Sequence, residues 1–395
     1  MSDDPRPKHQ RISQDLQNAI ATGRYGVGAR LPSEAQLVRQ HLVSRPTVIR
    51  ALKELEARGV IERRMGSGSF VRRPEVSDHH TRQLGLLIPG LGRTEIFELI
   101  CGELAGLARS HDYSLLWGGA THASLDANPN PNLTAEQALE ICEQFVKRGL
   151  NGVFFAPFEL VAHREEINRQ IAERFRQVGI PVILIDRDIG PFPKRSDFDL
   201  VGLDNMAAGH LLAEHFLKLG CQRIAFVARP HSASTVDARI AGVREAFVRR
   251  GLDFPRDWVR IGDPKEAVFT RRLLAGRPWD ALLCANDYTA AELLRSIQQQ
   301  GGRVPDDIRV AGFDDVRFAT LLSSPLTTVH QPCRDIAVAA LRAMLDRILD
   351  PTLPPRSQLL TPTLVVRESC GTYIGTSASA PGRSAGRATG KVLKT

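Results

Sequence analysis

The chain has 395 residues, of which 43% are hydrophobic and 24% are charged, as in folded proteins that face water. This length favours two or three domains. The sequence has no apolar run of about 18 residues, and its first ten residues lack the apolar core of a signal peptide. We therefore expect no membrane span and a cytoplasmic location.

The cysteines and histidines also narrow the chemistry. The six cysteines are far apart and none forms a CxxC pair, so neither a zinc ribbon nor a redox motif is indicated. Such cysteines are typical of reduced, buried thiols. His79 and His80 are adjacent but have no third metal ligand near them, so we expect neither a metal nor a cofactor.

Charge is distributed unevenly along the chain. Residues 1–74 contain 14 Lys/Arg and 7 Asp/Glu, a net charge of +7, and residues 372–395 contain four basic residues and no acidic one. Since the whole chain carries +8, the part between them carries −3. A basic N-terminal region beside a mildly acidic body indicates a polyanionic partner. A solvated basic face is the alternative.

The first predicted domain, residues 1–73, contains three helices. Ile12, Leu16 and Ile20 lie at helical spacing. Ser33, followed three residues later by Gln36, has the pattern of a capping box at the start of a second helix. A third helix is predicted from position 44, with a proline in its first turn and an apolar stripe at positions 48, 51, 52 and 55.

A hairpin is predicted after the third helix. The runs "VIERR" and "SFVRR" have strand-like composition and flank "MGSG", a turn signal. The predicted order is therefore three helices and a two-stranded wing. Residues 74–83 are polar and aperiodic, and we interpret them as a linker.

The second predicted domain, residues 84–371, alternates apolar runs with amphipathic helices. The apolar runs are "LGLLI", "YSLLW", "GVFFA", "PVILI", "RIAFVA", "ALLCA" and "IRVAGF". This alternation predicts an α/β fold with two parallel sheets built from βαβ units. Residues 372–395 are rich in Gly, Ser, Ala and basic residues, and we expect a disordered basic tail.

The third predicted helix has the surface of a DNA-reading element. With its apolar stripe inward, Arg50 and Lys53 point outward and Thr47 lies at the flank. Ser44 and Arg45 stand at the N-terminus, where free N–H groups and the helix dipole favour a phosphate. Such a helix fits the major groove, where Arg50 can form two hydrogen bonds to guanine. Taken alone, the basic residues also fit a solvated helix face.

The wing carries a second candidate contact. Arg63 and Arg64 lead into a small Gly-Ser-Gly tip, which fits a phosphate backbone or a minor groove. Taken alone the tip is a hairpin turn, and it does not match the phosphate-binding GxxxxGK[ST] pattern.

Together these features closely resemble the winged helix-turn-helix of the GntR family of bacterial repressors. The matching stretches are "LPSE" at 31–34, "VSRPTV" at 43–48, "AL" at 51–52 and "GSGSFV" at 66–71. The family often has arginine where this chain has Ala35 and Ile49, so no operator sequence is implied. The expected DNA-binding residues are Ser33, Ser44, Arg45, Thr47, Arg50, Lys53, Arg64, Gly66, Ser67 and Gly68.

Polar side chains follow several of the predicted strands. Asp186 and Arg187 follow "PVILI", Asn286 follows "ALLCA", Asp314 follows "IRVAGF" and Gln331 follows "TTVH". Ligands of open α/β sheets bind at the carboxyl ends of the strands. Carboxylate, amide and guanidinium groups suit sugar hydroxyls, each of which both donates and accepts hydrogen bonds.

The same region resembles LacI-type effector domains, which are similar to periplasmic sugar-binding proteins. The matching stretches are "PVILIDR" at 181–187, "VGLDNMAAG" at 201–209, "ARIAGVREAF" at 238–247, "CAND" at 284–287, "VPDDIRVAGFDD" at 304–315 and "PLTTVHQP" at 325–332. The resemblance implies two α/β lobes that clamp a small ligand. The residues it implies at the ligand are Phe97, Asp186, Arg187, Arg239, Asn286, Asp314 and Gln331.

Each of these residues has a structural alternative. Asp186 fits a cap after its strand, Arg187 fits a bridge between lobes, and Phe97 fits the core. Asn286 and Asp314 also fit turns.

Three further expectations concern neighbouring residues. Arg239 has Asp237 and Glu245 on its own predicted helix as alternative partners. We expect Asp287 to cap the helix that begins there. The stretch "APFEL" at 156–160 lacks a polar group that some sugar binders have there.

These observations favour a DNA-binding transcriptional regulator, most simply a repressor, controlled by a small effector bound between two lobes. We expect a sugar, with a purine or a sugar phosphate as the alternative. Two linked heads match a two-fold symmetric double-stranded operator, so a homodimer is expected. Either induction or corepression is consistent, because a ligand shifts an equilibrium only through its different affinity for the two states.

Two other classes of protein fit the sequence less well. A sugar-acting enzyme has little support, since no P-loop and no GxGxxG pattern follows a strand, and we expect no catalytic residue. A transport binding protein conflicts with the basic head and the missing signal peptide.

Overall fold

The computed structural model describes residues 7–21, 24–26, 28–57, 60–64, 68–71, 82–89, 95–118, 134–276 and 278–372. The chain divides into two compact units, residues 1–81 and residues 82–395. We name the first unit the head and the second the body.

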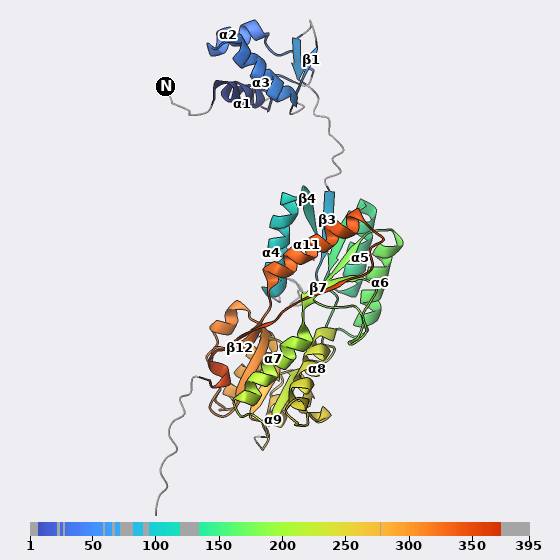
Figure 1. Cartoon of the computed structure of the whole chain (residues 1–395), viewed down its shortest axis with the longest axis vertical. Helices are drawn as coiled ribbons and strands as arrows, with labels where there is room; N and C mark the ends of the chain where they lie inside the picture. Colours follow the sequence, from blue (N-terminus) through green and yellow to red (C-terminus); the bar gives the residue numbers. More distant parts are fainter. Residues whose placement is uncertain are drawn as a thin grey trace, which may run out of the picture. The chain divides into compact units, whose positions relative to one another are not determined.

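The head contains three helices followed by a hairpin, in the predicted order (Figure 1). The helices are α1 (Lys8–Ala21), α2 (Glu34–His41) and α3 (Arg45–Ala57). Strands β1 (Ile61–Arg64) and β2 (Gly68–Val71) pair antiparallel. A bridge between Arg30 and Phe70 joins the segment before α2 to this hairpin. The predicted winged helix-turn-helix is confirmed.

One face of each helix builds the core of the head. Ile12 and Leu16 of α1 and Leu37 of α2 are at most 4% exposed. The predicted apolar stripe of α3, at positions 48, 51, 52 and 55, is fully buried among them. Because this stripe points inward, the opposite side of α3 faces solvent.

The body contains two six-stranded sheets, which define two lobes (Figure 1). The sheet of lobe 1 is parallel throughout, in the order β13-β7-β6-β5-β3-β4. Its strands are β3 (Arg82–Leu87), β4 (Tyr113–Gly118), β5 (Gly152–Phe155), β6 (Val182–Ile185), β7 (Asp199–Leu203) and β13 (Ser357–Leu360). Its helices are α4 (Glu95–Ser110), α5 (Ala135–Arg148) and α6 (Arg164–Gln177).

The sheet of lobe 2 has the order β14-β12-β11-β10-β8-β9 and is parallel except at β14. Its strands are β8 (Ile224–Ala228), β9 (Val259–Ile261), β10 (Ala281–Cys284), β11 (Arg309–Asp314), β12 (Thr327–His330) and β14 (Thr363–Val365). Its helices are α7 (Asn205–Lys218), α8 (Ser234–Val248), α9 (Ala267–Leu274) and α10 (Asp287–Gln299). Short 3-10 turns are η1 (Arg256–Trp258), η2 (Arg317–Thr320) and η3 (Glu368–Cys370).

The chain passes between the lobes three times. It crosses after β7, after β12 and between β13 and β14. After β12, helix α11 (Cys333–Leu349) returns to lobe 1 and packs beside α4 and over β6 and β7 (Figure 1). These crossings bring the carboxyl ends of strands from both sheets together, as expected of a two-lobed binding fold.

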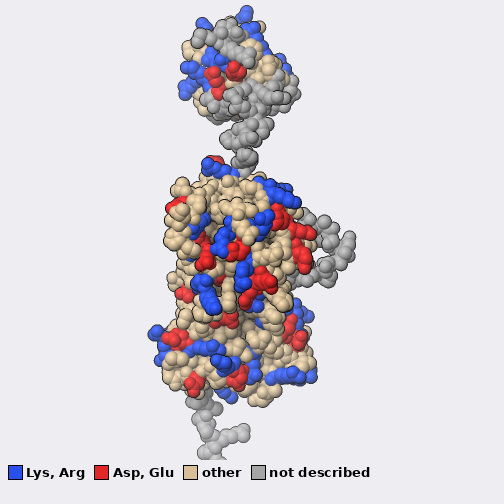
Figure 2. All heavy atoms as spheres, turned by 90° about the vertical axis from the view of Figure 1, so that its right-hand side faces the viewer, with Lys and Arg blue, Asp and Glu red and all other residues tan. Residues whose placement is uncertain are grey.

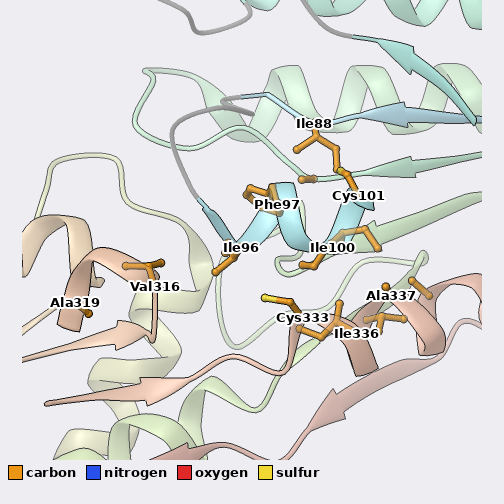
Figure 3. Packing of buried hydrophobic residues seen from close by; sticks show 14 of the residues in the cluster. Ile88, Ile96, Phe97, Ile100, Cys101, Val316, Ala319, Cys333, Ile336 and Ala337 are labelled. Atoms are coloured by element: carbon orange, nitrogen blue, oxygen red, sulfur yellow. The ribbon is translucent and has the colours of Figure 1, made fainter. Parts of the chain in front are cut away.

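A single apolar cluster continues from lobe 1 into lobe 2. It includes Ile96 and Phe97 of α4 and Ile336 of α11, together with Val316 and Ala319 near η2 (Figure 3). Each of these five side chains is less than 9% exposed. The two lobes therefore share apolar packing between α4 and the segment around η2.

The predicted strands are largely confirmed. All seven apolar runs form strands, and "TTVH" forms β12. The interior strand β7 was not predicted, and neither were the edge strands β9, β13 and β14, whose three or four residues give no periodicity. Strand β3 begins at Arg82, so the last two residues of the predicted linker lie in the body. The rest of that linker, His79 and His80 included, and residues 373–395 of the predicted tail lie outside the described residues.

Candidate DNA interface and effector cleft

The N-terminus of α3 presents polar and basic side chains to solvent. Ser44, Arg45, Arg50 and Lys53 are exposed and Thr47 is half-buried. The Ser44 and Thr47 hydroxyl oxygens are 2.8 Å apart, so one donates to the other. The structure therefore places these five predicted residues at the surface of the head, with Arg50 and Lys53 on the side of α3 opposite the buried stripe. In Figure 2, lysine and arginine side chains gather along one edge of the head beside a small acidic group.

Ser33 has a structural task in the head. Its hydroxyl accepts a hydrogen bond from the Gln36 backbone N–H at 3.3 Å, and the Gln36 side chain accepts one from the Ser33 N–H at 2.8 Å. This is the predicted capping box, and it fixes the start of α2. The residue that follows, Glu34, is a site residue that sequence reasoning missed, because its carboxylate contacts Arg45 and Arg63.

The wing depends on a glycine. Gly68 has φ +111°, a conformation that side chains rarely adopt, and a Cβ there would lie 2.9 Å from Arg30 Nε. Arg30 is exposed and lies against the base of the wing, and sequence reasoning missed it too. Gly66 and Ser67 lie outside the described residues, as does the side chain of Arg64, whose backbone ends β1.

In the body, the end of β6 joins both lobes. Asp186 Oδ1 accepts a hydrogen bond from Gln331 Nε2 at 2.9 Å, which links β6 to the crossing that follows β12. The neighbouring Arg187 contacts Glu159 Oε1 through Nη1 at 2.5 Å. Its guanidinium also stands over the Phe97 ring, 5.2 Å from the centroid. Phe97 is 1% exposed, so Arg187 already covers one face of the ring expected to meet a ligand.

A second cluster surrounds Arg239 on α8. Its Nε donates to Asn205 Oδ1 at 2.7 Å, its Nη1 donates to the Ala285 carbonyl, and its Nη2 is 3.6 Å from Asp314 Oδ1. The guanidinium lies 4.5 Å from the centroid of the Phe313 ring. The alternative pairing of Arg239 with Asp237 or Glu245 on its own helix is therefore wrong, because the side chain points into lobe 2.

The cap expected at Asp287 needs correction, whereas the ligand contact expected of Asn286 stays a prediction. Asn286 is the N-cap of α10, and its Oδ1 accepts from the Thr289 N–H at 2.8 Å. Asp287 does not cap the helix. It is fully buried and accepts from the Thr328 hydroxyl at 2.6 Å and from the Val316 N–H at 3.2 Å.

Sequence reasoning also missed Glu159. The sequence indicated only that the stretch at 156–160 lacks a polar group that some sugar binders have there, whereas in the structure Glu159 of this stretch supplies the carboxylate that pairs with Arg187. The sequence gives no signal for Glu159, because only the folded chain places its carboxylate beside Arg187 at the end of β6. Asn205, the first residue of α7, was missed in the same way.

The local backbone of the cleft is unusual at two aspartates. Asp186 has φ +70° and Asp314 has φ +112°, both in the left-handed region that non-glycine residues rarely adopt. These residues stand at the ends of β6 and β11. Such strain is concentrated at ligand-binding positions in folded proteins.

Burial and neighbouring charges change the ionisation of the cleft. Burial raises the pKa of the Asp314 carboxyl to about 7, with Arg239 opposing the rise and Asp186 reinforcing it. Burial alone would raise the pKa of Glu159 and lower that of Arg187. Their ion pair reverses both effects, lowering the carboxyl pKa and raising the guanidinium pKa. The buried charges of the cleft are therefore largely compensated.

Two buried polar atoms in the cleft form no hydrogen bond with the described residues. Gln331 Oε1 is a buried acceptor and Arg187 Nε is a buried donor, and neither forms a hydrogen bond. Gln331 is 1% exposed and Arg187 5%. Arg187 Nε also lies 3.6 Å from Asp186 Oδ2, an ion-pair contact. Buried polar groups are costly when unpaired, so a ligand hydroxyl that donates to Gln331 Oε1 would be favourable.

The lobes touch around this cleft. The Leu160 N–H donates to the His231 carbonyl at 2.7 Å, and the Ser234 hydroxyl donates to the Asp188 carbonyl at 3.4 Å. A cavity beside these contacts is lined by residues that include Asp186, Arg187, Asn205 and Thr235. Lobe 1 contributes residues at the ends of β6 and β7 to this cavity, and lobe 2 contributes the first turns of α7 and α8, whereas Arg239, Asp314 and Gln331 are not among its lining residues.

Two classes of site are not seen in the part of the chain that the structure describes. No three His, Cys, Asp or Glu side chains lie together as metal ligands there. Among the described helices, none has the length and apolarity needed to cross a bilayer.

Family comparisons match the two parts separately. Residues 8–71 match the family described as "Bacterial regulatory proteins, gntR family". Residues 213–370 match the family described as "Periplasmic binding protein-like domain".

Individual relatives extend these matches over the whole chain. The arabinose metabolism transcriptional repressor of Geobacillus stearothermophilus is 26% identical over 380 residues, which cover 93% of this chain and 99% of the relative. The ribose operon repressor of Escherichia coli K12 is 31% identical over 217 residues, 53% of this chain and 63% of the relative.

The solved structure of the transcriptional regulator CelR–cellobiose complex is similar with a TM-score of 0.61 and 22% identity, covering 83% of this chain and 91% of that chain. At that identity the likeness concerns the fold. The chain therefore combines a GntR-type helix-turn-helix region with a periplasmic-binding-protein-like region.

Proposed function

We propose that this protein is a cytoplasmic DNA-binding transcriptional regulator, most simply a repressor, whose operator affinity is set by a small neutral sugar bound between the lobes of the body. One observation carries the proposal: a winged helix-turn-helix with an exposed basic reading helix is joined in one chain to a two-lobed body with a buried, hydroxyl-matched cleft. Relatives named as repressors of sugar genes support it.

On the DNA side, α3 would enter the major groove, with Arg50 and Lys53 toward the bases and Ser44 and Arg45 at phosphates. The wing and Arg30 would contact the adjacent backbone. A homodimer would present two heads to a two-fold symmetric operator.

On the ligand side, the charge balance favours a neutral sugar over a sugar phosphate. Arg187 already faces Glu159 and Asp186, and Arg239 faces Asp314. At Arg187 an added phosphate would therefore meet a cation whose charge is compensated by two carboxylates. Sugar hydroxyls would instead form hydrogen bonds with Gln331 Oε1 and Arg187 Nε, and a ligand without hydroxyls would leave both atoms without a hydrogen bond.

Control of DNA binding would follow from the contacts that join the lobes. Asp186 with Gln331 links lobe 1 to a crossing segment, so a ligand there changes the free energy of lobe closure. Operator affinity shifts only if the ligand binds the DNA-competent and DNA-free states with different affinities.

The proposal is tested in two steps with the full chain. Thermal unfolding with pentoses, hexoses, disaccharides, sugar phosphates and purines should give a rise in Tm with a neutral sugar, since a ligand of the folded state stabilises it. Selection from a random duplex pool should enrich one symmetric sequence. Enrichment with a Tm rise only for sugar phosphates or purines would overturn the neutral-sugar assignment. No enrichment would overturn the DNA-binding role.

A further inference from the structure

One carboxylate in the head holds two arginines from different elements. Glu34 Oε2 accepts from Arg45 Nε at 2.9 Å, and Glu34 Oε1 accepts from Arg63 Nη2 at 2.7 Å. Arg45 is the first residue of α3, and Arg63 lies in strand β1 of the wing. The reading helix and the wing are therefore joined through a single side chain.

Glu34 is held in place independently of these arginines. It is the first residue of α2, directly after the Ser33 capping box. A carboxylate in the first turn interacts favourably with the helix dipole. The Glu34 side chain is only 23% exposed. It is therefore a fixed point to which the two longer side chains are attached.

These ion pairs contribute little to the stability of the head. The Arg45 side chain is 74% exposed and that of Arg63 is 28% exposed. Ion pairs near solvent are weak, because water screens the charges and two long side chains must be ordered. The contacts with Glu34 instead fix the orientation of the two guanidinium groups. Without them, the arginine side chains would sample many rotamers.

We propose that Glu34 is a positioning residue that makes DNA binding selective; this inference rests on the proposed function. A mobile arginine can neutralise any phosphate, which strengthens binding to every sequence. An arginine held by Glu34 meets DNA in one orientation, and less side-chain entropy is lost on binding the matching site. At mismatched sites the carboxylate faces phosphates and opposes binding.

The test compares Glu34→Gln with Glu56→Gln in the full chain. Both substitutions remove one negative charge from the head. Glu56 is exposed near the end of α3 and forms no ion pair with any residue that the structure describes. Dissociation constants are measured by fluorescence anisotropy for the enriched duplex and for a shuffled duplex of the same composition, across a series of salt concentrations.

Glu34→Gln is expected to lower the ratio of selected to shuffled affinity at least about fivefold, because the freed arginines can then neutralise phosphates of any sequence. The salt dependence on the shuffled duplex should steepen by about one released counterion. Glu56→Gln should leave the affinity ratio within about twofold. Glu34→Asp retains the charge and should restore most of the ratio.

The double variant Arg45→Ala/Arg63→Ala separates positioning from general structure. In that background, adding Glu34→Gln should no longer change the affinity ratio, because the residues it acts through are gone. If Glu34→Gln behaves like Glu56→Gln, or lowers the ratio equally in both backgrounds, the inference is overturned. A wild-type chain that does not discriminate between the duplexes would instead contradict the proposed function itself.

Discussion

The head and the body use arginine in opposite ways. In the head, Arg45 is 74% exposed although it contacts Glu34. In the body, the side chains of Arg187 and Arg239 are 6% and 5% exposed and face carboxylates. Exposed arginines remain available to a polyanion, whereas buried ones fix a polar cavity. An exposed arginine–carboxylate pair in the head thus suits phosphate recognition. Buried arginine–carboxylate pairs in the body suit hydroxyl recognition.

The largest expected effect comes from removing a buried cation. Arg239→Ala leaves Asp314 and Asn205 without their partner and should lower the free energy of unfolding by about 3–5 kcal/mol. The measurement is urea unfolding of the body transition. Arg249→Ala at the C-cap of the same helix breaks an exposed pair with Glu245 and should cost at most about 1 kcal/mol. Equal losses would contradict the contrast between buried and exposed pairs.

The raised pKa of Asp314 predicts a pH dependence of stability. Between the ordinary aspartate pKa and about 7, the unfolded chain has lost this proton and the folded body retains it. Stability should therefore fall as pH rises through this window, by up to about 1.4 kcal/mol per unit, and level off above it. Burial also raises the pKa of Asp287, which adds a slope of the same sign. Asp314→Asn should flatten the Tm profile between pH 4.5 and 7, and an unchanged profile would refute the assignment.

A smaller effect is expected at the reading helix. Arg50→Ala should weaken binding to the selected duplex by about 1–3 kcal/mol, without lowering Tm, because the side chain is exposed. Arg39→Ala removes the same charge from α2 and should weaken selected and shuffled duplexes alike. Anisotropy titrations of both variants on both duplexes give the comparison. Loss of equal size on the two duplexes for Arg50→Ala would remove it from base recognition.

The smallest effect concerns the turn between α2 and α3. Leu42 is the C-cap of α2 with φ +51° and is 88% exposed. Its side chain therefore strains a left-handed backbone conformation without packing into the core. Leu42→Gly should raise the free energy of unfolding by about 1 kcal/mol. Calorimetry of the head transition measures it. A loss of stability would show that Leu42 makes contacts that its exposure does not suggest.

Much of the fold could be predicted because the spacing of apolar residues along the sequence indicates which side chains are buried. The stripe of α3, the capping box at Ser33 and the seven apolar strands all follow from local pattern. The cleft was predicted only in part. Asp186, Arg187 and Gln331 stand at strand ends, and a local rule finds them.

What escaped prediction depends on contacts between distant segments. Glu159 pairs with Arg187, and Asn205 pairs with Arg239, 34 residues away in the sequence. Glu34 reaches Arg63 across 29 residues. No spacing rule identifies such partners, because the tertiary fold alone decides which carboxylate or amide reaches a guanidinium. The N-cap of α10 was predicted at Asp287 but is Asn286. The reason is related, since the buried Asp287 side chain accepts a hydrogen bond from Thr328, 41 residues away in the sequence.

The most direct test of the central claim is an operator titration with and without effector. The full chain is titrated onto the selected duplex by anisotropy, first alone and then with a saturating neutral sugar that raises its Tm. Our account predicts at least a fivefold change in Kd, since allosteric coupling is typically about 1–3 kcal/mol. The same change should be absent in Gln331→Ala. A sugar that raises the Tm but leaves the operator Kd unchanged would contradict the account.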